Sequence, residues 1–166
     1  MKAKITIFML AALCGVSVYF LYYLKSEESK IKEKFVELAS WVDKKEKNES
    51  LLSIAVLSHT TENIFAPKTV IDIHYTMING KKTPDDISHY AVRARSLFEK
   101  IELTFHDITV DIYSANNAHV VVTAYLVAES NSRLRINDIT ELDCELEKVN
   151  GKWLFSEIKT VDILKK

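Results

Sequence analysis

The chain opens with an unbroken apolar run, Ile5 to Leu24, that has lysines on both sides. An α-helix needs about 20 apolar residues to cross the hydrocarbon core of a bilayer, and no side chain in this run is ionised. The pattern therefore predicts a transmembrane signal-anchor over residues 1–25, with a single span.

A cleaved signal peptide is the alternative for this segment, because Lys2 and Lys4 form a basic region ahead of the run. The small residues suited to cleavage, Gly15 and Ser17, lie inside the run, which favours a retained anchor. The short N-terminal tail favours an N-terminus in the cytoplasm, although lysines on both sides leave the orientation open. We therefore expect a single-pass membrane protein whose remaining residues lie outside the cytoplasm, in the periplasm if the source is bacterial.

After the anchor, hydrophobic positions recur at helical spacing. Residues 26–48 are interpreted as an amphipathic first helix and a connector, with one apolar stripe made by Ile31, Phe35, Leu38 and Val42 and widened by Val36 and Trp41. A second helix can follow Ser50 and must end before Pro67. Thr83 and Pro84 provide the N-cap and the N1 proline of a third helix.

The rest of the chain alternates as β-strands do. Residues 70–77 predict one strand, and the C-terminal half predicts several long ones. The apolar phase shifts by one residue at His106-Asp107, which is what a β-bulge produces. Asn150-Gly151 predicts a two-residue hairpin turn that pairs Leu146 with Phe155. Helices followed by a meander of strands indicate an α+β fold, in which residues 49–166 complete the domain begun at residue 26.

Composition removes several classes of function. The chain has 166 residues with a formal net charge of −1, from 22 Lys and Arg against 23 Asp and Glu, which argues against a nucleic-acid partner. Cys14 lies in the predicted span, so Cys144 has no partner for a disulfide within the domain. The five histidines show no paired ligand spacing and no Gly-rich phosphate loop occurs, so we expect neither a metal nor a cofactor.

From Ser50 to its end the chain resembles the nuclear transport factor 2-like superfamily, also called SnoaL-like or cystatin-like. The stretches that carry the resemblance are Ile73 to Gly80, Thr83-Pro84, Phe105 to Ile108, and Glu147 to Phe155. The resemblance implies a cone in which three helices pack on a curved, mainly antiparallel sheet. This superfold carries isomerases, cyclases, dehydratases, transport adaptors and non-catalytic subunits of membrane complexes, so the resemblance does not by itself imply a reaction.

Candidate site residues are side chains that the cone would enclose, where burial can shift a pKa. Tyr75 is a tyrosine without a matching family motif, and His106 reaches the interior only if the bulge turns it inward. Glu157 shares the strand parity of Trp153 and Phe155, which would place its carboxyl among apolar neighbours with a raised pKa, as an acid or base. The alternative is a bulge that turns Glu157 outward. The candidate pocket is therefore predicted from Trp41, Tyr75, Phe105, His106 and Glu157, with no catalytic residue assigned.

These observations favour a membrane-anchored binding or assembly module without catalytic activity. Membrane-tethered members of the superfamily, such as inner-membrane subunits of type IV secretion systems, have a similar layout and act as scaffolds. The partners that this interpretation allows are a protein, a second copy docked through the outer face of the sheet, or a small apolar ligand. The alternatives are a small-molecule lyase or isomerase, and a ligand carrier that uses a pocket inside the cone and is secreted if the apolar run is cleaved.

Overall fold

The computed structural model describes residues 26–45, 51–74, 78–130 and 135–161. The predicted membrane anchor over residues 1–25 lies outside these ranges. Within them, no helix is both long enough and apolar enough to cross a bilayer. The elements are a helix over residues 26–42 (here the N-terminal helix), α2 (Leu51–Ile64), β1 (Phe65–Asp72), β2 (Gly80–Lys82), α3 (Pro84–Leu97), β3 (Phe98–Ser114), β4 (Asn117–Ser130), β5 (Arg135–Val149) and β6 (Lys152–Thr160).

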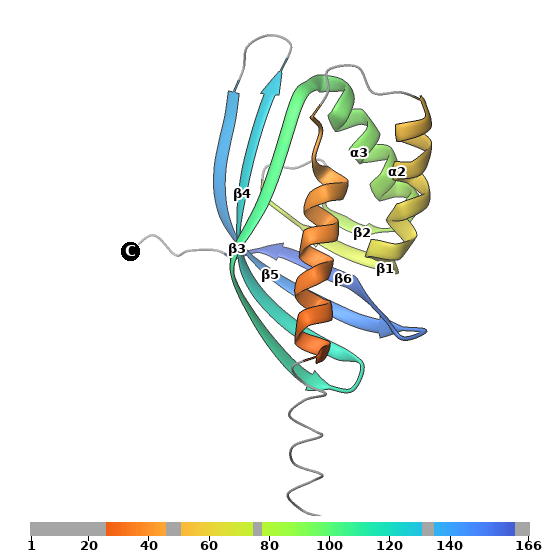
Figure 1. Cartoon of the computed structure of the whole chain (residues 1–166), viewed down its shortest axis with the longest axis vertical. Coiled ribbons are helices and arrows are strands. Elements are labelled where there is room, and N and C mark those ends of the chain that lie inside the picture. The colour runs from red at the N-terminus through yellow and green to blue at the C-terminus, as the bar shows by residue number, and fades with distance from the viewer. Residues whose placement is uncertain (1–25, 46–50, 75–77, 131–134, 162–166) are drawn as a thin grey trace, which may run out of the picture.

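The described strands form one six-stranded sheet in the order β2-β1-β6-β5-β4-β3. β1 runs parallel to β6, and every other neighbouring pair is antiparallel. The sheet curves around the N-terminal helix, while α2 and α3 lie together over the end of the sheet formed by β1 and β2 (Figure 1). The predicted α+β plan, three helices on a curved and mainly antiparallel sheet, is confirmed.

The N-terminal helix is held against the concave face of the sheet by aromatic packing. Phe35 has no exposed surface, and its ring meets the rings of Phe105 and Phe155 edge-on, with centroids 5.2 and 5.0 Å apart. Edge-to-face contacts of this kind add to the burial of large apolar rings. The core therefore lies between this helix and strands β3 and β6.

Three local signals in the sequence have the structures predicted for them. The Thr83 side chain caps α3 by accepting from the Asp86 amide, and the Asp86 carboxylate accepts from the Thr83 amide in return. Asp107 has a φ of 53°, and the register between β3 and β4 shifts between His106 and Thr109, as a bulge requires. The Asn150-Gly151 turn has positive φ at both residues.

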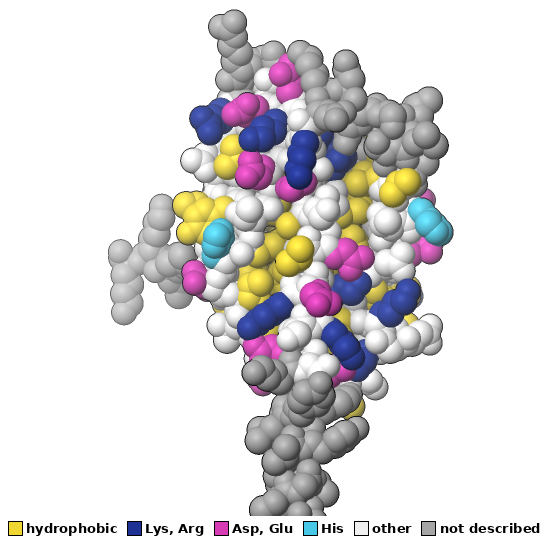
Figure 2. All heavy atoms as spheres, viewed as in Figure 1, with side chains coloured by type: hydrophobic (Ala, Val, Ile, Leu, Met, Phe, Trp, Pro, Cys, Tyr) yellow, Lys and Arg dark blue, Asp and Glu magenta, His cyan; other side chains and the backbone are white. Residues whose placement is uncertain are grey.

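The N-terminal helix and α2 leave an open groove of about 840 Å³ between them. Val36 from the N-terminal helix and Val56 from α2 line it, and both are exposed. Figure 2 shows hydrophobic side chains at the surface over these helices, with charged side chains around them. Val36 was expected on the buried stripe of its helix but is 69% exposed, because the core contacts are made by Ile31, Phe35 and Leu38.

Candidate functional site

A cavity of about 290 Å³ lies inside the cone, under the C-terminal half of the N-terminal helix. Except for Asp138 and Thr140, its lining side chains are all hydrophobic. They come from every layer of the fold and include Leu38, Trp41 and Val42 from the helix and Leu103, Phe105, Ala124 and Leu126 from β3 and β4. A cavity lined in this way favours an apolar ligand.

The polar part of the cavity is a pair of side chains on β5. Asp138 and Thr140 are two residues apart on one strand and therefore share its concave face. The Thr140 hydroxyl donates to the Asp138 carboxylate at 3.0 Å. Asp138 is exposed while Thr140 is half-buried, so the pair lies where the cavity meets solvent. Their oxygens can accept a hydrogen bond, or a proton, from a ligand whose apolar body occupies the cavity.

Backbone and side-chain hydrogen bonds fix the end of the N-terminal helix that covers the cavity. The Arg95 guanidinium donates to the carbonyls of Trp41, Val42 and Asp43 at 2.8 to 2.9 Å, which satisfies acceptors that a helix end leaves open. The Trp41 indole donates to the Leu57 carbonyl at 3.1 Å. Trp41 is therefore held between the cavity and α2 by contacts at its backbone and at its ring.

Two of the five predicted pocket residues, Trp41 and Phe105, line this cavity, and Tyr75 lies outside the described residues. His106 does not line it. Since Phe105 faces inward, the neighbouring His106 faces outward, where it is exposed and meets the Tyr125 ring edge-on at 4.8 Å. The bulge begins after His106 and so does not turn its side chain inward.

Glu157 also does not line the cavity. The β5–β6 register shifts between Glu145 and Leu146, so that Glu145 pairs with Glu157 while Leu146 pairs with Phe155. The extra residue, Ser156, reverses the parity that the sequence suggested. Glu157 instead forms an ion pair with Lys159 at 2.7 Å.

Sequence reasoning missed Asp138. A signal was present, since Thr140, Leu142 and Cys144 alternate inward along the same strand and Asp138 continues that parity. A carboxylate at such a position indicates either the open end of a sheet or a binding site. Among the described residues no cluster of three or more His, Cys, Asp or Glu side chains can hold a metal ion. Burial raises the pKa of the Cys144 thiol, so this cysteine is an unreactive core residue.

A second apolar groove of about 410 Å³ lies between α3 and the end of the N-terminal helix. Its lining shares Trp41, Val42, Ile78 and Ile87 with the cone cavity. The two spaces therefore adjoin at these four side chains.

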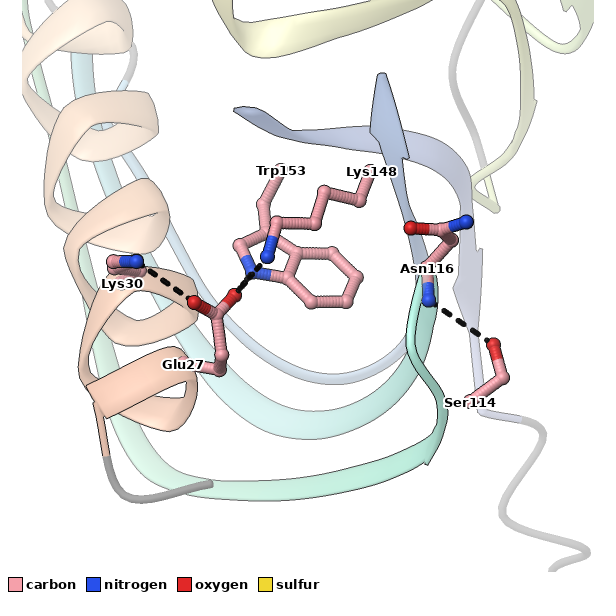
Figure 3. Close-up of polar contacts among 6 residues, drawn as sticks. All are labelled: Glu27, Lys30, Ser114, Asn116, Lys148 and Trp153. Carbon is pink, nitrogen blue, oxygen red and sulfur yellow. Dashed lines mark hydrogen bonds and ion pairs between the residues drawn. The ribbon is translucent and has the colours of Figure 1, made fainter. Parts of the chain in front are cut away.

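A buried polar cluster lies far from both spaces, near the first turn of the N-terminal helix (Figure 3). The Glu27 carboxylate accepts from Lys148 at 2.5 Å, from Lys30 at 2.7 Å and from the Trp153 indole at 2.8 Å. Burial alone would raise the pKa of Glu27, but these hydrogen bonds outweigh it and lower the pKa from 4.5 to about 2. Glu27 is therefore an ionised group that joins the N-terminal helix to β5 and β6, and it has no part in the cavity.

No family model and no curated protein matches the chain in sequence. Its fold is similar to that of several solved structures. The Kfla4162 protein from Kribbella flavida has a TM-score of 0.67 at 14% identity, and the match covers 83% of this chain and 91% of that protein. A type 2 hexachlorocyclohexane dehydrochlorinase, LinA, has a TM-score of 0.65 at 14% identity over 82% of this chain and 84% of its own.

A Streptomyces avermitilis protein of the NTF2-like family has a TM-score of 0.59 at 8% identity, over 84% of this chain and 99% of its own. These similarities show that the chain has the nuclear transport factor 2-like fold. At identities this low, a chemistry for this chain has to come from its own side chains.

Proposed function

We propose that the cone binds a small, mainly apolar molecule whose one polar group meets Asp138 and Thr140. The observation that carries this proposal is the 290 Å³ cavity, whose lining is hydrophobic apart from those two side chains. A cavity of about 150 Å³ accommodates benzene, so this one suits a molecule of roughly two fused rings. The hydrogen-bonded pair at the open end favours a ligand with a hydroxyl or amine donor.

The sequence favoured a membrane-anchored binding or assembly module without catalytic activity, with a small-molecule lyase or isomerase, or a ligand carrier, as the alternatives. The geometry supports small-molecule binding better than assembly, because the described residues form an apolar cavity inside the cone. The predicted anchor over residues 1–25 would tether the domain that carries this binding site to a membrane. Docking of a partner or second copy through the outer face of the sheet remains a prediction.

A second candidate function is a lyase in which Asp138 acts as the base. In an elimination, its carboxylate would take a proton from the substrate, the C–H electrons would form the double bond, and the leaving group would depart as an anion. The observation in favour is a carboxylate at the edge of an apolar cavity, in a fold that also carries a hexachlorocyclohexane dehydrochlorinase. Among the described lining residues, Asp138 is the single ionisable side chain, which makes binding the simpler proposal.

Equilibrium dialysis of the full-length chain against 2-naphthol and naphthalene tests the binding proposal. We expect both to bind, and 2-naphthol to bind about threefold to tenfold more tightly because its hydroxyl can donate to Asp138 or Thr140. Ala124→Phe places a ring in the cavity and should weaken both ligands about tenfold or more. Thr123→Phe is the matched control, since Thr123 is the neighbouring residue on the opposite face of β4.

If 2-naphthol and naphthalene bind Ala124→Phe as tightly as the native chain, a site in the cone is contradicted. Asp138→Ala combined with Thr140→Val should remove the preference for 2-naphthol while leaving naphthalene binding intact. Chloride release from hexachlorocyclohexane that Asp138→Asn abolishes would favour the lyase instead.

A further inference from the structure

The groove beside α3 differs in charge from the cone cavity. Its two charged lining residues are Arg93 and Arg95, and no carboxylate is among the described residues that line it. Arg95 donates to three backbone carbonyls at the end of the N-terminal helix. Arg93 is exposed on α3 and lines the groove from its rim. The groove therefore combines apolar walls with a positive edge.

A third cation lies close to the same groove. The Lys82 ammonium is 5.2 Å from the centre of the Tyr90 ring, and Tyr90 lines the groove. Leu97 adds an exposed apolar side chain to the lining, with 59% of its surface accessible. A surface that presents an exposed leucine beside cations suits a ligand with both an apolar chain and a negative charge.

The groove and the cone cavity are adjacent, since Trp41, Val42, Ile78 and Ile87 line both. A ligand too long for the cone can extend past these side chains and remain on apolar surface. The pair Asp138 and Thr140 belongs only to the cone, and Arg93 belongs only to the groove. The two spaces thus differ in the sign of the charge at their edges.

We infer that the groove extends the ligand site, and that the full site binds a free amphiphile whose apolar chain passes from the cone into the groove and whose anionic group meets Arg93. This inference rests on the proposed binding function and names its ligand class. A long linear carboxylate with a hydroxyl at the far end of its chain is the simplest molecule that meets both Arg93 and the Asp138–Thr140 pair, and a plain alkyl carboxylate probes the groove half of this site.

A free molecule fits this site better than a lipid that remains in a bilayer. The predicted anchor would join the domain at residue 26, while Trp41 lies at the far end of the same helix. Fifteen residues of helix span about 22 Å, which is most of the thickness of a bilayer core. With this helix continuing the anchor along the membrane normal, the groove would stand well away from the membrane surface.

Displacement of 2-naphthol from the full-length chain by alkyl carboxylates and by primary alcohols of equal length tests the inference. We expect affinity to rise about fourfold per added methylene, and to continue rising beyond about 12 carbon atoms, where the cone alone would be full. Beyond that length, where the carboxylate reaches Arg93, we also expect each carboxylate to bind about threefold to fivefold more tightly than its alcohol. Arg93→Gln should remove that preference, and Arg93→Lys should keep it.

Ala94→Phe should block the groove and end the gain with chain length, while 2-naphthol binding stays unchanged, because Ala94 lines the groove and not the cone. Ser96→Phe is the control on the same helix, since Ser96 is exposed and does not line the groove. No carboxylate preference, or one that survives Arg93→Gln, would overturn the inference while leaving 2-naphthol binding in place. Binding to anionic phospholipid vesicles without displacement of 2-naphthol would overturn it in favour of a membrane headgroup. If 2-naphthol itself fails to bind, the proposed function fails first.

Discussion

Replacing Glu27 with alanine should lower the free energy of unfolding by about 3 to 5 kcal/mol at pH 7. The Glu27 side chain is 4% exposed and accepts from Lys148, Lys30 and Trp153. The Lys148 side chain is only 13% exposed, so the variant leaves a buried ammonium and a buried indole N–H without this acceptor. Urea denaturation followed by tryptophan fluorescence measures the loss.

Matched variants separate the charge cluster from simple loss of packing. Glu27→Leu combined with Lys148→Met replaces the pair by apolar side chains and should restore most of the stability. Lys30→Ala should cost less than about 1 kcal/mol, because the Lys30 side chain is 54% exposed. A loss below about 1 kcal/mol for Glu27→Ala would contradict the role given to this cluster.

The same cluster predicts a pH dependence. The pKa of Glu27 is lowered from 4.5 to about 2 in the folded chain, so the folded state favours the ionised form. Its stabilising contribution, about 3 kcal/mol, is complete above pH 4.5 and is lost as the pH falls toward 2. Between pH 5 and pH 2, Glu27→Ala should therefore lose less stability than the native chain does.

Phe35→Ala should also cost about 3 to 5 kcal/mol. The Phe35 ring is fully buried and packs against both Phe105 and Phe155, so its removal leaves a void under the centre of the N-terminal helix. Phe105 lines the cone cavity, and the void would therefore also loosen one wall of the proposed site. Thermal and urea unfolding measure the first effect, and 2-naphthol affinity measures the second.

The neighbouring residue provides the control for Phe35. Val36→Ala lies one residue further along the helix, is largely exposed, and should change stability by less than about 0.5 kcal/mol. Phe35→Leu should cost clearly less than Phe35→Ala, because it keeps most of the apolar volume. Equal effects of Phe35→Ala and Val36→Ala would show that the helix is not docked as described.

Features encoded by a few adjacent residues could be predicted from the sequence. The capping box at Thr83, the bulge at Asp107 and the hairpin turn at Asn150 each depend on local backbone preferences and side-chain chemistry. The inward positions of Trp41 and Phe105 followed from periodicity alone. A helix turns every third or fourth residue toward the core, and a strand turns every second residue toward it.

Features that depend on distant partners could not be predicted. The sequence left open whether a bulge turns Glu157 outward, and only the pairing of β6 with β5 shows that one extra residue, Ser156, does so. Glu27 lies four residues before Ile31, on the apolar stripe, but its partners Lys148 and Trp153 are more than 120 residues away. Asp138 was missed because its sequence context is that of an ordinary exposed strand residue. Its place at the end of the cavity depends on the curvature of the sheet around the N-terminal helix.

A crystal structure of the full-length chain grown with 2-naphthol tests the central claim, that the cone is a small-molecule site, most directly. We expect ring density between Phe105 and Leu126, with the hydroxyl within hydrogen-bond distance of the Asp138 or Thr140 side chain. A cone closed by its own side chains, with 2-naphthol absent or held only on the outer face of the sheet, would contradict that claim.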